Sequence, residues 1–209
     1  MDRLKKELQS KGFTDDALKD AMRFILEKED LTKYLQNKTS LSLYNCELTE
    51  LPEWISNLVN LKSLHLSNNN LTELPESIGN LVNLKSLKVF INKLTELPES
   101  IGDLVKLKQL SLHNNNFTEF PESIGNLVNL KELWLSDNNI TELPEWISKL
   151  VKLKSLHLNQ NKLTELPEWI GNLVKLKSLY LWGNNFSNEY KDELKQFFKT
   201  NLPNCTLIF

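Results

Sequence analysis

Few side chains in this sequence have the types and spacing needed for chemistry, and its three histidines come first. His65, His113 and His157 could ligate a metal ion, because neutral imidazole is a common zinc ligand. A zinc ion needs its ligands within about 2 Å of one point. A second candidate combines His113 with Ser136 and Asp137, which are the residue types of a nucleophilic triad. Each possibility depends on the elements that carry these residues.

Those elements come from a repeat with a period of 23 residues. The segment that begins at Leu61 reads LKSLHLSNNNLTELPESIGNLVN. Related segments begin at Leu84, Leu107, Leu130 and Leu153, a partial copy ends at Asn60, and another begins at Leu176. A fixed period of this length predicts a solenoid of about seven copies, in which each copy buries its apolar face against its neighbours.

Each copy contains the pattern of one short strand and one return segment. Leu64 and Leu66 alternate with His65 and Ser67, which predicts a half-buried strand. Pro75 ends the extended run, and apolar residues then return at roughly helical spacing. Stacked copies would form a parallel sheet with strands about 4.8 Å apart.

This arrangement argues against both kinds of chemistry. Neighbouring histidines lie two copies apart, or about 10 Å in the stack, so they cannot share a metal ion. Ser136 on an open sheet would have no evident oxyanion hole, and Asp137 is poorly placed to orient His113. We therefore expect no metal site, no cofactor and no enzymatic activity.

One asparagine recurs in every full copy, at the bend after the strand. A buried amide must be hydrogen-bonded, so we interpret this column as a structural ladder that pairs with the backbone of the coils. Cys46 takes the equivalent place in the first copy. The column comprises Asn69, Asn92, Asn115, Asn138, Asn161 and Asn184.

The full pattern, L-x-x-L-x-L-x-x-N-x-L-T-E-L-P-E-x-I-G-x-L, resembles the leucine-rich-repeat family. It is most similar to the 23-residue class of Ras-scaffold-type, plant intracellular and bacterial repeat proteins. The resemblance implies an α/β solenoid: a right-handed arc with a concave parallel β-sheet and a partner-binding role. It implies no particular partner.

The two ends of the chain depart from the repeat, as terminal caps of a solenoid should. Residues 1–37 have helical periodicity and are predicted to form a helical N-terminal cap, with a separate partner-binding helical domain as the alternative. Residues 38–187 are the repeats. Residues 188–209 are predicted to form a C-terminal cap, in which Pro203 separates a helix from a last strand.

Strand residues that point away from the core would form the concave face, and several of them are aromatic. Exposed aromatic side chains are typical of binding surfaces, although cross-strand contacts that stabilise the sheet are the alternative reading. Trp134, His157, Tyr180 and Trp182 form one group near the C-terminus, and Phe90 and Ile91 form a smaller apolar spot. The predicted partner-binding residues are Tyr44, His65, Phe90, Ile91, His113, Trp134, His157, Tyr180 and Trp182.

Other columns lie outside the concave face. Trp54, Trp146 and Trp169 share one convex position, where packing against a neighbouring coil is at least as well supported as binding. One lysine per copy predicts a basic edge, and one glutamate per copy predicts an acidic edge on the opposite side. Such charges could steer a partner, but solvation is their more ordinary role.

Composition limits the class of partner and the compartment. The net charge of −2 gives no drive toward nucleic acid or an anionic membrane. No apolar run approaches the roughly 20 residues of a membrane span, and no signal peptide is visible. Cys46 and Cys205 lie too far apart in the repeat to form a disulfide. These features favour the cytoplasm, with secretion by a signal-peptide-independent route as the alternative.

The sequence therefore predicts a non-catalytic, monomeric module that binds a protein or peptide on its concave face. The alternative function is that of an exported bacterial effector or surface protein that binds a host molecule.

Overall fold

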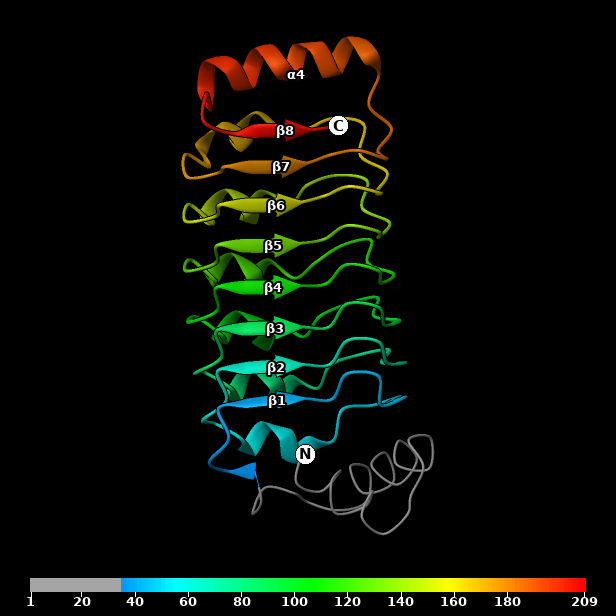
Figure 1. Ribbon diagram of the computed structural model, residues 1–209, viewed down its shortest axis with the longest axis vertical. Coiled ribbons are helices and arrows are strands. Elements are labelled where there is room, and N and C mark those ends of the chain that lie inside the picture. Colours follow the sequence, from blue (N-terminus) through cyan, green and yellow to red (C-terminus); the bar gives the residue numbers. More distant parts are fainter. Residues whose placement is uncertain (1–34) are drawn as a thin grey trace, which may run out of the picture.

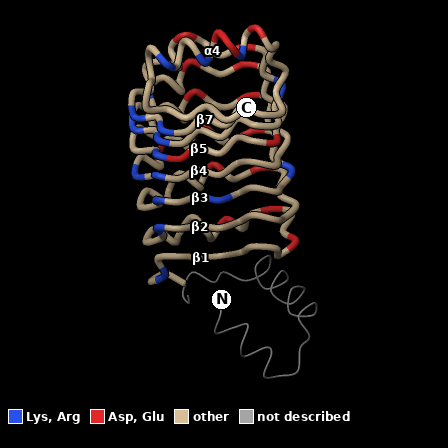
Figure 2. The backbone as a smooth tube through the Cα atoms, turned by 45° about the horizontal axis from the view of Figure 1, so that its top comes forward, with Lys and Arg blue, Asp and Glu red and all other residues tan. Residues whose placement is uncertain are grey.

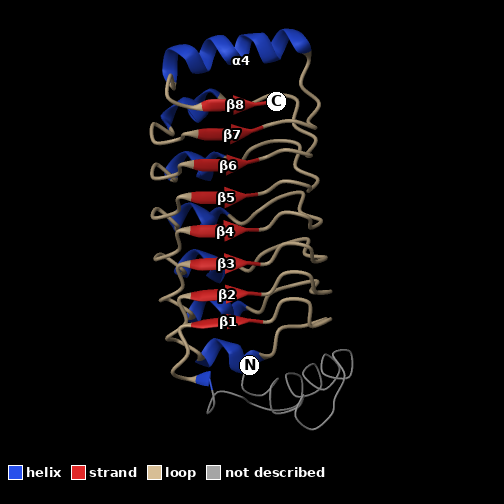
Figure 3. Ribbon diagram, in the orientation of Figure 1, coloured by secondary structure: helices blue, strands red, loops and turns tan. Residues whose placement is uncertain are grey.

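The computed structural model describes residues 35–209, and it shows coils of the repeat stacked along one axis (Figure 1). Each coil has one strand on the concave sheet and one short 3₁₀ helix behind it (Figure 3). The strands are β1 (Ser40–Ser42), β2 (Ser63–His65), β3 (Ser86–Lys88), β4 (Gln109–Ser111), β5 (Glu132–Trp134), β6 (Ser155–His157), β7 (Ser178–Tyr180) and β8 (Thr206–Ile208). The predicted parallel solenoid is confirmed.

The sheet is parallel and open, and its strands follow the order of the sequence from β1 to β8. The register places equivalent residues side by side, so that Leu64 pairs with Leu87 and Leu87 pairs with Leu110. A constant repeat length keeps each side chain on the same face from one strand to the next. Residues at the same position of successive copies therefore lie in one row along the solenoid.

The return segments are 3₁₀ helices, and a proline precedes each of them. They are η1 (Glu53–Asn57), η2 (Glu76–Asn80), η3 (Glu99–Asp103), η4 (Glu122–Asn126), η5 (Glu145–Lys149) and η6 (Glu168–Asn172). In η2, Pro75 has φ −68°, and its carbonyl accepts a hydrogen bond of 3.0 Å from the Ile78 amide. Proline fixes this φ value and so favours the start of a helical turn. The short turn buries Ile78 and returns the chain to the next strand.

Leucine and isoleucine from every coil form one continuous core between the sheet and the 3₁₀ helices. Leu64, Leu87 and Leu110 of the strands have no exposed surface. Because every coil contributes the same apolar positions, no coil has to close a core by itself. The concave side chains are therefore not needed to complete this interior.

The asparagine ladder lies at the bend that follows each strand. The Asn138 amide nitrogen donates to the carbonyls of Leu112 and Leu135, at 3.2 and 3.1 Å. Its oxygen accepts from the Phe117 amide at 3.1 Å. The same amide-to-backbone contacts are present at Asn69, Asn92, Asn115, Asn161 and Asn184. Each amide thus joins its own coil to the preceding one.

Helix α4 (Asn188–Asn201) and strand β8 follow the last coil. The Ser187 side chain accepts a hydrogen bond from the Tyr190 amide and caps the helix. Leu194 and Phe198 are buried against the core, and β8 pairs with β7. The assignment of residues 188–209 as a cap stays a prediction. The predicted N-terminal cap lies outside the described residues, apart from its last three positions.

Two further sequence expectations concern cysteines and membrane spans. Cys46 follows β1 and Cys205 precedes β8, at opposite ends of the sheet, and no disulfide joins them. Among residues 35–209, no helix has the length and apolar character to cross a bilayer.

Candidate partner-binding surface

The concave surface is built from strand residues that alternate with the buried leucines. In β5, Leu133 is fully buried, whereas Trp134 beside it is partly exposed. Strand β5 ends at Trp134, but the residue two positions later, Ser136 in this coil, lies on the same concave face. Each coil therefore has two successive places for an outward side chain, as the period of a strand requires.

Aromatic rings at these places form one continuous row, which we call the ring ladder. It contains one ring from each of seven successive coils. The distances between neighbouring ring centroids are 5.2 Å for Tyr44–His65, 5.6 Å for His65–Phe90, 4.3 Å for Phe90–His113, 5.6 Å for His113–Trp134, 4.2 Å for Trp134–His157 and 4.0 Å for His157–Tyr180. The two separate aromatic groups expected from the sequence are thus joined into one row.

The rings of the ladder cover one another's faces. The interplanar angle is 9° for His157 and Tyr180, 19° for Trp134 and His157, and 11° for Phe90 and His113. Stacking runs from strand to strand, and strand side chains stand roughly perpendicular to the sheet. The outer edges of the rings, rather than their faces, are therefore turned toward a ligand on the concave side.

Trp182 and Ile91 belong to the same surface but lie outside the ladder. Trp182 is 43% exposed and has no aromatic contact within the part of the chain that the structure describes. Ile91 is 44% exposed and has φ +53°. Left-handed backbone is unusual for a β-branched residue, and Asn, Asp, Gln or Gly occupies the equivalent place in the other coils. Ile91 therefore combines an exposed apolar side chain with a strained backbone.

The ladder also determines the charge of its histidines. Burial lowers the pKa of His113, although the nearby Asp137 carboxylate opposes this effect. Burial also lowers the pKa of His65, with a further contribution from Lys88. The pKa of His157 falls to about 4, mainly because of burial and secondly because of His113. All three imidazoles are consequently neutral at pH 7, and the ladder carries no charge there.

The geometry also bears on the two chemical hypotheses. No group of three metal-ligating side chains lies close enough to hold an ion within residues 35–209. The His113 ring stacks on Phe90, and its Nδ1 atom has no hydrogen-bond partner among the described residues. Ser136 lies at the equivalent outward position of the next coil and is only 6% exposed. Among the described residues, no hydrogen bond joins the side chains of His113, Ser136 and Asp137, so these three residues are not arranged as a catalytic relay.

A polar column beside the ladder was not anticipated. Gln109 donates a hydrogen bond of 3.0 Å to Glu132 across two strands. The Ser155 hydroxyl lies 3.0 Å from both the Ser178 hydroxyl and Nε2 of His157. Each residue of this column lies two positions before the first outward position of its strand, as Ser155 does before His157. Because strand side chains alternate between the two faces, the sequence could have identified this column.

The convex tryptophans pack against the coils. Trp146 is only 4% exposed and makes an edge-to-face contact of 6.2 Å with Phe120. Trp54 and Trp169 are partly buried against the same core. Packing therefore accounts for their position better than a convex binding site does.

An open, parallel, single-strand-per-coil solenoid with an asparagine at each bend defines a class of repeat protein. A family model described as a leucine-rich repeat region matches residues 28–113 and 98–200. The chain belongs to the leucine-rich-repeat family.

Solved leucine-rich-repeat structures resemble the chain. A Leptospira interrogans LRR protein is 34% identical, with a TM-score of 0.69, and the match covers 88% of this chain and 52% of that one. The Listeria monocytogenes internalin InlF is 26% identical, with a TM-score of 0.72 and coverages of 87% and 50%. The plant peptide hormone receptor RGFR1, solved in complex with RGF2, is 32% identical, with a TM-score of 0.63 and coverages of 72% and 29%.

The chain therefore spans about half the length of the two bacterial proteins. No curated protein matches the sequence.

Proposed function

We propose that the chain is a non-catalytic interaction module that binds a protein or peptide on its concave face. The observation that carries this proposal is the ring ladder, which places one aromatic side chain per coil on a surface that the core does not need. Leucine-rich-repeat folds serve generally as protein-interaction modules, and one similar structure is that of a plant peptide hormone receptor in complex with RGF2.

The orientation of the rings favours a protein over a carbohydrate or a nucleobase. Sugars and bases bind aromatic residues by stacking on their faces, but neighbours cover the faces of His157 and Trp134. The edge of an aromatic ring carries partial positive charge, so it suits carbonyl oxygens, carboxylates and the faces of other rings. A polypeptide supplies all three.

The charge of the concave face agrees with this assignment. Lys88, Glu132 and Asp137 are the charged residues at its outward positions, and the histidines are neutral at pH 7. A largely uncharged aromatic surface gains affinity from apolar burial and specific polar contacts, as the centres of protein interfaces do. Nucleic-acid binding, in contrast, depends on many cationic contacts.

The competing explanation is that the rings only stabilise the sheet through cross-strand contacts. A pull-down can separate the two, using the wild type and the Trp134→Ala/Tyr180→Ala/Trp182→Ala variant. Trp169→Ala on the convex side is the matched control. We expect the wild type and the control to retain a partner that the triple variant loses, while circular dichroism shows all three folded. Equal retention by all three would contradict concave binding.

A second candidate is that of an exported bacterial effector or surface protein that binds a host molecule. It is favoured by the similarity to repeat proteins of two bacteria, Leptospira interrogans and Listeria monocytogenes. Fractionation of the source cells tests it, because an exported protein should be found outside intact cells. Recovery only in the cytosolic fraction, beside a cytosolic marker, would contradict export.

A further inference from the structure

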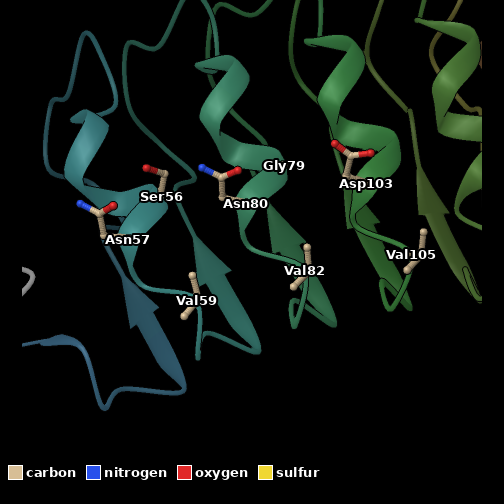
Figure 4. A pocket seen from close by; sticks show the side chains of 8 residues that line it. All are labelled: Ser56, Asn57, Val59, Gly79, Asn80, Val82, Asp103 and Val105. Carbon is tan, nitrogen blue, oxygen red and sulfur yellow. The ribbon is translucent and has the colours of Figure 1, made fainter.

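A column of valines lies along the edge of the solenoid where each strand begins. Each of the six coils that contain a 3₁₀ helix presents one valine in the turn before the next strand, as Figure 4 shows for Val59, Val82 and Val105. The exposed fractions are 46% for Val59, 44% for Val82, 45% for Val105, 44% for Val128, 47% for Val151 and 72% for Val174. A contiguous row of exposed apolar side chains is characteristic of an interaction surface.

A column of lysines flanks these valines, three residues further along each coil. The lysines lie along the side of the solenoid where the strands start (Figure 2). No salt bridge involves them within residues 35–209. All are exposed, and they are Lys62, Lys85, Lys108, Lys131, Lys154 and Lys177. We call the two columns together the valine–lysine edge. This edge is apolar and cationic, so a complementary partner surface would be apolar and anionic.

The opposite edge of the same molecule has that composition. A groove of about 560 Å³ runs across three coils there, next to the 3₁₀ helices η2, η3 and η4. Its apolar surface comes mainly from the partly exposed Phe120, Pro75, Pro98 and Pro121, because Leu74 and Leu97 at its base are only 4% and 5% exposed. Its acidic residues are Glu73, Glu76, Glu96, Glu99 and Glu119. We call this region the glutamate groove.

We propose that the valine–lysine edge of one molecule docks into the glutamate groove of a second copy. Both surfaces repeat every 23 residues, so they have the same spacing along the solenoid axis. A sideways translation of one copy therefore brings its valines against the prolines and Phe120 of the groove, and its lysines near the glutamates, over several coils. The net charge of −2 adds little repulsion between copies.

The two contacting surfaces differ, so this contact is heterologous and does not close by itself. It adds copies side by side and leaves every concave face accessible on the same side of the assembly. Self-association and concave binding are therefore independent. The monomer expected from the sequence is the alternative that the experiments below distinguish.

Sedimentation velocity over a range of protein concentrations tests the proposal with the full chain. We expect the sedimentation coefficient of the wild type to rise with concentration at low salt, and to rise less at high salt because screening weakens exposed charge pairs. The Val82→Thr/Val105→Thr/Val128→Thr variant keeps the shape of the edge but makes it polar, so it should associate at least about tenfold more weakly. Concave Trp182→Ala is the control and should associate like the wild type.

A charge exchange gives a sharper test of the pairing. Lys85→Glu/Lys108→Glu/Lys131→Glu and Glu73→Lys/Glu96→Lys/Glu119→Lys should each be monomeric alone, since each variant has two edges of like charge. An equimolar mixture should recover association. A wild type that is monomeric at every concentration would overturn the proposal, as would a mixture that stays monomeric. Binding to acidic peptides or anionic vesicles without self-association would assign the edge to another partner.

Discussion

Two columns run along this solenoid, and each coil adds one residue to both, except that Cys46 replaces the asparagine in the first coil. The asparagine ladder uses one residue type at one position, and its amides are bonded to backbone groups. The ring ladder uses four residue types at two positions, and Nε2 of His65 and Nδ1 of His113 have no partner among the described residues. A column that is uniform and fully hydrogen-bonded suits the fold, whereas one that varies from coil to coil suits recognition.

Removal of one asparagine should have the largest effect on stability. Asn138→Leu would leave the buried Phe117 amide without a partner. The Leu112 and Leu135 carbonyls would lose one hydrogen bond each and keep those from Asn115 and Asn161. Because an unsatisfied buried group costs about 1–3 kcal/mol and the two carbonyls also lose a hydrogen bond each, we expect the free energy of unfolding to fall by at least about 2 kcal/mol. Urea unfolding followed by circular dichroism measures it.

Asn139→Ala is the matched control for this variant, since its side chain is partly exposed in the same coil. It should change the free energy of unfolding by less than about 0.5 kcal/mol. Similar losses in the two variants would mean that the asparagine ladder is not what holds the coils together.

Acid should affect the ring ladder through His157. Its pKa of about 4 in the folded protein lies below the ordinary value of 6.5, so the unfolded chain binds more protons between these two pH values. The free energy of unfolding should therefore decrease as the pH falls from 6.5 toward 4. His157→Phe keeps a ring in the ladder and should lose less stability over this range.

Urea unfolding of both proteins at pH 7 and pH 5 makes this comparison. The two proteins differ in no other titratable group, so the difference between their pH dependences isolates the imidazole of His157. An identical pH dependence would show that burial in the ring ladder does not keep His157 neutral.

Ile91→Asn should have the smallest effect on stability, and the opposite sign. Asn tolerates φ +53°, and it already occupies this place in other coils, so we expect a gain of about 1 kcal/mol in the free energy of unfolding. Affinity for the concave partner should decrease about tenfold, because an exposed apolar contact is lost. Thermal unfolding and calorimetric titration measure the two quantities.

Asn114→Ile is the reverse change at the same position of the next coil, at φ +54°. It should destabilise the protein without improving affinity. If the Ile91→Asn variant is more stable and binds the partner unchanged, Ile91 is not part of the binding surface, and the ring ladder has to be tested separately.

The repeat predicts most of the fold, because a constant period fixes which residues become neighbours in space. Leu64 beside Leu87 and the backbone bonds of Asn138 both follow from that period and from the need to satisfy buried amides. The 3₁₀ form of the return segment does not follow, since Leu74, Ile78 and Leu81 fit either kind of helix at that length.

The candidate site is predicted only as a set of positions. Phe90 and His113 lie at a different outward position from Trp134 and His157, and the sequence does not give the side-chain angles that bring all four into one row. Two other features, the strained backbone of Ile91 and the exposed valine column, could have been predicted from the repeat. The strained Ile91 replaces Asn at a bend, and the exposed Val82 recurs in every coil.

The most direct test of the central claim is the affinity of a purified partner for the Trp134→Ala/Tyr180→Ala/Trp182→Ala variant, measured by calorimetry together with the stability of that variant. We predict a dissociation constant at least about 30-fold higher than that of the wild type, as expected for loss of a binding hot spot. The variant should still unfold cooperatively. An unchanged dissociation constant in the folded variant would contradict the assignment of the ring ladder to recognition.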